Sequence, residues 1–115
     1  MTIRRIEPGQ RMSQAVVYAN TVYLAGQVGA AGASVADQTR AVLAQIDRLL
    51  GEAGSDKSRL LSATIWLADI GDFAEMNSVW ETWIDPANPP ARATGESKLA
   101  APEYVVEIIV TAACG

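Results

Sequence analysis

The stretch VVEIIVTA, residues 105–112, decides the fold, because it predicts a strand that is apolar at nearly every position. One carboxylate, Glu107, interrupts it. A carboxylate is costly to bury in such a strand unless it is paired or hydrogen-bonded. Glu107 is therefore a candidate functional residue. The alternatives are a position at a sheet edge or a structural ion pair with an arginine.

A shorter strand, residues 91–96, carries a second candidate. Strand alternation places Arg92, Thr94 and Glu96 on one face and only small residues on the other. A guanidinium beside a hydroxyl is suited to a carboxylate ligand. The alternative is a surface arginine on a solvated strand.

Four more strands are predicted upstream of these two, over residues 2–6, 15–18, 22–25 and 61–67. The first ends at Pro8-Gly9, and the next two form a hairpin around residues 19–21. In the fourth strand, one face is apolar and alternates with Ser62, Thr64 and Trp66. That apolar face comprises Leu61, Ala63, Ile65 and Leu67.

Two amphipathic helices complete the pattern. The first follows a Ser34 cap and ends at Gly51 and Gly54. The second starts at residues 72–75, which resemble a capping box with Asp72 as the cap, and stops before the proline-rich residues 85–90. The order β-ββ-α-β-α-β-β predicts an α+β fold, a two-layer sandwich of one mixed sheet and two helices, with residues 1–115 as one domain.

Composition excludes several classes of function. The net charge of −4 argues against broad attraction to nucleic acid or anionic lipid. No apolar run is long enough for a membrane span, and no apolar stretch follows the first two arginines as in a secretory signal, so we expect a cytoplasmic protein. The chain has no histidine and one cysteine, Cys114, so we expect no disulfide within the chain and no metal held by the protein. Acid–base work must fall to carboxylates, tyrosine, lysine, water or the substrate.

A wider pattern connects these segments. Its most specific part is PARAT at residues 90–94 followed by VEI at 106–108. Supporting pieces are AGQ at 25–27, ATIWLAD at 63–69 and DFAEMN at 72–77. Together, from residue 12 to residue 113, they resemble the RidA family, also called the YjgF or reactive-intermediate-deaminase family.

The resemblance implies a chorismate-mutase-like fold and a homotrimer with sites between neighbouring subunits. It also implies cofactor-independent hydrolysis of enamines and imines, such as 2-aminoacrylate, to 2-keto acids and ammonia. Arg92 would hold the substrate carboxylate, Glu107 would help to position water near the imine carbon, and Asn77 would line the cleft or brace its helix. The trimer is also expected because two short helices leave apolar strand surface uncovered.

Three positions depart from the family pattern. Met12 stands where the family has a tyrosine, Ala25 where it has a serine, and Thr94 where it has a cysteine. We expect these three residues and Gly26 to line the substrate site with Arg92. Part of the polar lining is therefore replaced. The short second loop and the Trp-rich second helix resemble a divergent branch of the family.

Two other functions compete with hydrolysis. The first is a non-catalytic module that uses Arg92 to bind a small carboxylate metabolite and signals through an interface. The second is a ribonuclease or translation inhibitor, a label attached to the family. The acidic balance and the lack of histidine count against the second.

Overall fold

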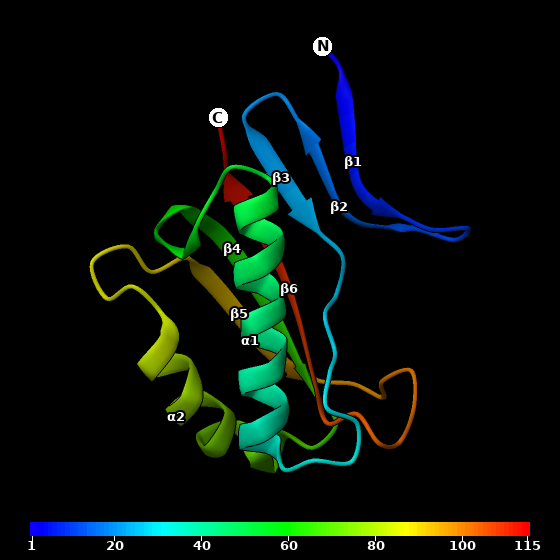
Figure 1. Cartoon of the computed structure of the whole chain (residues 1–115). Coiled ribbons are helices and arrows are strands. Elements are labelled where there is room, and N and C mark those ends of the chain that lie inside the picture. The colour runs from blue at the N-terminus through cyan, green and yellow to red at the C-terminus, as the bar shows by residue number, and fades with distance from the viewer.

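Six strands form one mixed sheet in the computed structural model, which describes residues 1–115 (Figure 1). The order across the sheet is β1-β2-β3-β6-β4-β5, and only β4 and β5 run parallel. Every predicted strand is present, with ends that differ by at most two residues. The strands are β1 (Ile3–Pro8), β2 (Ser13–Tyr18), β3 (Thr21–Leu24), β4 (Leu60–Leu67), β5 (Ala91–Glu96) and β6 (Val106–Ala113).

Both predicted helices are also present and lie on the same face of the sheet (Figure 1). They are α1 (Val35–Glu52) and α2 (Phe73–Trp83), and short 3-10 turns, η1 (Lys57–Arg59) and η2 (Ile70–Asp72), flank β4. Ser34 caps α1 as predicted, since its side chain accepts a hydrogen bond from the Asp37 N–H at 3.1 Å. Neither helix combines the length and the apolar character that a membrane crossing requires.

The predicted capping box of α2 is wrong. Asp72 makes no side-chain hydrogen bond at the helix start, because η2 precedes α2 and Asp69 instead accepts from the Gly71 N–H at 2.8 Å. Glu75 turns to the other helix and accepts from the Ala36 N–H at 2.9 Å. A carboxylate of α2 thus satisfies a free donor in the first turn of α1 and ties the two helices together.

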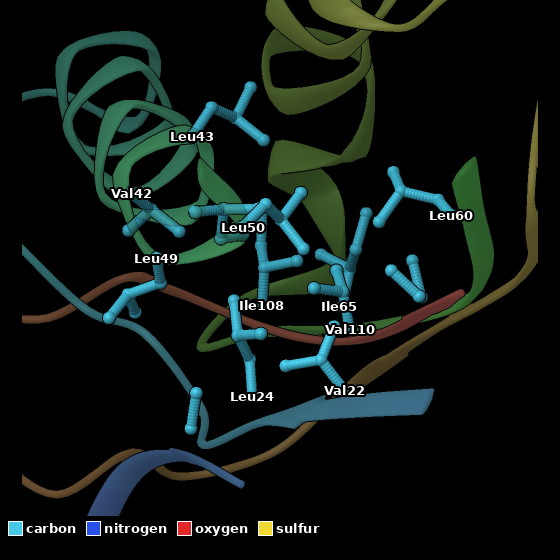
Figure 2. Packing of buried hydrophobic residues seen from close by; sticks show 14 of the residues in the cluster. Val22, Leu24, Val42, Leu43, Leu49, Leu50, Leu60, Ile65, Ile108 and Val110 are labelled. Atoms are coloured by element: carbon cyan, nitrogen blue, oxygen red, sulfur yellow. The ribbon is translucent and has the colours of Figure 1, made fainter. Parts of the chain in front are cut away.

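The core lies between the helices and one face of the sheet (Figure 2). Strands β4 and β6 occupy the middle of the helix-covered part of the sheet and send alternate side chains into this core. Those buried side chains are Leu60, Ala63, Ile65 and Leu67 from β4 and Val106, Ile108, Val110 and Ala112 from β6. The apolar residues 105–112 therefore form a central strand, and the fold is α+β as predicted.

Leu61 corrects the predicted apolar face of β4. The register shifts between Leu60 and Ser62, which pair with Ala112 and Thr111. Leu61 is the extra residue of this bulge, so it leaves the alternation and is 51% exposed, whereas Leu60 is buried.

The crossover from β4 through α2 to β5 positions the functional region. Parallel neighbouring strands need such a crossover, and here the connecting helix packs back over the pair it joins. The helix-facing side chains of edge strand β5 therefore lie beneath α2.

The bulge makes two adjacent leucines a matched test. Leu60→Ala should lower the free energy of unfolding by about 2–5 kcal/mol, because it leaves a cavity in the core. Leu61→Ala removes an exposed side chain and should change it by about 0.5 kcal/mol or less. Urea titration followed by circular dichroism measures both. Equal losses would contradict the bulged register.

Candidate functional site

Arg92 begins the helix-facing row of β5. It pairs with Ala63 of β4, a core residue, so its side chain points to the layer occupied by α2. Its Nη1 donates a hydrogen bond to Asn77 Oδ1 at 2.7 Å. The ion pairs of the chain involve Arg40 and Arg48 and none includes Arg92. Arg92 is thus a half-buried cation without an acidic partner.

Two aromatic rings of α2 contact the same guanidinium. Arg92 Cζ lies 5.6 Å from the ring centroid of Phe73 and 5.3 Å from that of Trp80, within the range of cation–π attraction. These contacts of Phe73 and Trp80 with Arg92 were not predicted from the sequence. The signal was available in the helical spacing, because positions 73, 77 and 80 share one face of α2.

Thr94 lies two residues further along the same row and pairs with the core residue Ile65. Its Oγ1 is the one buried side-chain polar atom in the chain without a hydrogen-bond partner. An unsatisfied buried hydroxyl costs about 1–3 kcal/mol. The hydroxyl lies on the Arg92 face of β5 and is closed to solvent within one chain.

Glu107 occupies the other face of the sheet. It lies in β6 opposite Trp66, whose side chain is 36% exposed on the face without helices. The structural alternatives for Glu107 do not apply, because β6 is not an edge strand and no arginine pairs with the carboxylate. Instead, the carboxylate packs against Gly26, where an added Cβ would lie 2.8 Å from Glu107 Cδ.

Of the other predicted lining residues, Gly26 contacts Glu107, and Met12 lines a surface cavity together with Gly26 and residues of α1. Ala25 is fixed by its backbone, because its N–H donates to the Gln14 carbonyl at 2.9 Å and its carbonyl accepts from Gln27 Nε2 at 3.0 Å. The cavity that Met12 and Gly26 share has a volume of about 550 Å³, and neither Ala25 nor Glu107 lines it. It is lined by Glu7, Met12, Gln14, Gly26, Gln27, Val28, Gln45 and Arg48.

The cation of this cavity is already neutralised. Arg48 hydrogen-bonds to Glu7, an interaction that lowers the pKa of the Glu7 carboxyl, and Glu52 lies 3.4 Å from the same guanidinium. Arg48 is therefore paired with carboxylates, whereas Arg92 is not. Of these two arginines, only Arg92 offers an incoming carboxylate a cation without an acidic partner.

One chain does not bring the two groups of candidate residues together. Arg92, Thr94 and Asn77 form one group, the α2 half-site, at the β5 edge. Glu107 and the neighbouring Gly26 form the other, the β6 half-site. Strand β4 separates β5 from β6, and Arg92 and Glu107 project from opposite faces of the sheet. No group of three or more Asp, Glu or Cys side chains is placed to hold a metal ion.

Known proteins share this arrangement of strands and helices. The family model Endoribonuclease L-PSP matches residues 2–114. A RutC family protein from Haemophilus influenzae is 46% identical over 116 residues, which cover 99% of this chain and 100% of that protein. The crystal structure of a YjgF family member from Neisseria meningitidis has a TM-score of 0.97 and 48% identity, and covers 100% of this chain and 97% of its own.

A more distant relative has a named activity. The 2-iminobutanoate/2-iminopropanoate deaminase of Bos taurus is 38% identical over 88 residues, which cover 70% of this chain and 64% of that protein. The resemblance read from residues 12–113 is thereby confirmed. The chain belongs to the Endoribonuclease L-PSP family, to which the RutC and YjgF proteins are also related.

Proposed function

We propose that this protein hydrolyses reactive 2-imino acids, and the enamines that tautomerise to them, to 2-keto acids and ammonia. One observation carries the proposal: Arg92 is half-buried without an acidic partner and lies on the same strand row as the unsatisfied Thr94 hydroxyl. The unpaired guanidinium is suited to the carboxylate of an imino acid. The imine deaminase of Bos taurus supports the reaction class.

The proposed reaction needs little from the protein. Water adds to the carbon of the C=N bond and forms a carbinolamine, which loses ammonia and leaves the C=O of the keto acid. An iminium carbon is strongly electrophilic, so holding the substrate and a water together supplies much of the rate. Glu107 would accept a hydrogen bond from that water, take its proton as the C–O bond forms, and return the proton to the nitrogen as the C–N bond breaks.

Because the two half-sites lie on opposite faces of the sheet within one chain, we propose that each complete site forms between two copies of the chain. The α2 half-site of one copy would face the β6 half-site of its neighbour. The sheet face without helices supports this arrangement, since it exposes Tyr18, Tyr23 and Trp66. A cyclic homotrimer, implied by the family resemblance, would repeat one such interface and close on itself.

The non-catalytic binding module remains the alternative, because the α2 half-site alone offers a carboxylate anchor. Time-resolved decay of imines generated by an amino-acid oxidase separates the two functions. Faster decay supports the hydrolase, whereas 2-keto acid binding without faster decay supports the module. Nuclease activity is less favoured, despite the family's name, because the chain has a net charge of −4 and no histidine.

Arg92→Lys should lower kcat/KM for carboxylate-bearing imines by about 10- to 100-fold, because lysine keeps the charge but loses the planar fork. Arg92→Ala should lower kcat/KM further, because no cation remains. Imines without a carboxylate should be poor substrates that neither change affects. A folded Arg92→Ala protein with native kcat/KM would refute the anchor.

Gly26→Ala should slow hydrolysis and leave stability nearly unchanged. The added methyl would displace the flexible Glu107 carboxylate, and Gly26 is not among the residues with positive φ. Single-turnover rates measure the first effect, and thermal melting followed by circular dichroism measures the second. Gly51→Ala is a suitable control, because an added Cβ there meets no neighbour. A native rate in Gly26→Ala would argue against a role for Glu107 at its present position.

Mixing two inactive variants tests the shared site. Arg92→Ala lacks the anchor and Glu107→Gln lacks the base, so each homo-oligomer should be inactive. Co-refolding them in equal amounts should restore roughly one quarter of native activity, because one interface in four pairs an intact Arg92 with an intact Glu107. A mixture that stays inactive, although native mass spectrometry shows hetero-oligomers, would contradict a site between subunits.

A further inference from the structure

Asn77, which holds Arg92 by a hydrogen bond, is itself hydrogen-bonded to Glu81. Asn77 Nδ2 donates a hydrogen bond to Glu81 Oε1 at 2.9 Å, and Asn77 Oδ1 accepts from Arg92 Nη1 at 2.7 Å. We propose that Glu81 is a positioning residue that acts on Arg92 through the Asn77 amide. The proposal rests on the role of Arg92 as the carboxylate anchor of the proposed function.

The chemistry of the amide gives Glu81 this role. An asparagine presents a donor at one end and an acceptor at the other, and turning the amide over exchanges them. Arginine offers only donors, so Asn77 holds Arg92 only when its oxygen faces the guanidinium. An ionised Glu81 offers only acceptors and therefore requires the nitrogen on its own side. Glu81 thus selects the amide orientation that binds Arg92.

Helix geometry makes the contact available at little cost. Asn77 and Glu81 are four residues apart in α2, so their side chains are neighbours on one face of the helix. Glu81 is exposed and Asn77 is half-buried, so the contact runs from the surface to the anchor. Removing the Glu81 carboxylate would leave the core of the protein intact.

The neutral amide also keeps Arg92 available. A carboxylate in direct contact would pair with the guanidinium, as Glu7 pairs with Arg48. In the α2 half-site, Asn77 and the rings of Phe73 and Trp80 contact Arg92, and none of them carries a net charge. Glu81 therefore orients the support without occupying the cation that the ligand needs.

Three variants test this role. Glu81→Ala removes the acceptor, and Glu81→Gln keeps one acceptor oxygen in a side chain of the same length. Glu103→Ala is the control, because it also removes an exposed carboxylate, and the side chain of Glu103 makes no hydrogen bond or ion pair. The readouts are the Kd of pyruvate and of 2-oxobutanoate by titration calorimetry, and kcat and KM for imines with and without a carboxylate.

Glu81→Ala should raise the Kd of both keto acids, and the KM of carboxylate-bearing imines, by roughly 3- to 10-fold, the effect of one net hydrogen bond. The kcat and KM for imines without a carboxylate should not change. Glu81→Gln keeps an acceptor but adds a donor, so its Kd should lie between those of Glu81→Ala and the native protein, and Glu103→Ala should match the native protein. Native Kd values in Glu81→Ala would overturn the proposal, as would equal losses in the Ala and Gln variants accompanied by a lower Tm.

The same measurements separate this inference from the hydrolase. If the native protein binds keto acids but does not speed imine decay, and Glu81→Ala binds them more weakly, the hydrolase fails and the positioning role stands. If imines decay at the native rate in Glu81→Ala, with unchanged KM, the positioning role fails and the hydrolase stands. A native protein that binds neither keto acid, or an Arg92→Ala variant that binds them normally, would overturn both.

Discussion

Strand β6 runs through the middle of the sheet, so its alternate side chains must serve two different environments. Val106, Ile108 and Val110 face the helices and are buried in the core. That burial fixes the register of β6, because a slip of one residue would turn these side chains to the face without helices and bring Glu107 into the core. The position of the candidate base is therefore a consequence of how the core packs.

The same alternation in β5 sends Arg92 toward α2. The crossover from β4 to β5 brings the helix over that edge, and the helix supplies an amide and two aromatic rings to the guanidinium. None of these partners neutralises the charge. In contrast, Arg48 lies on the surface in direct contact with Glu7. The difference between a paired and an unpaired cation is the reason why Arg92, and not Arg48, is proposed as the anion site.

The separation of the half-sites follows from sheet topology. Strand β4 lies between β5 and β6, and no rotation of a side chain carries Arg92 from one face to the other. Any chemistry that uses Arg92 and Glu107 together must therefore involve a second copy of the chain. The proposed assembly would also cover the aromatic side chains that the sheet face without helices leaves exposed.

Periodic patterns in the sequence determined the element order, the α+β class and the core strands, because spacing of two and of 3.6 residues reflects local backbone geometry. They also singled out Arg92 and Glu107 as polar residues that a simple apolar strand or solvated surface does not explain. Leu61 was wrongly predicted to face the core, because a bulge breaks the alternation of β4. Glu75 was wrongly predicted to cap its own helix, because its carboxylate accepts a hydrogen bond from the first turn of α1. The opposite faces of the two candidates, the rings against Arg92 and the contact of Gly26 with Glu107 were decided only by the tertiary structure. Each depends on which strands are neighbours and where a helix crosses back, and these long-range pairings leave no periodic signal in the chain.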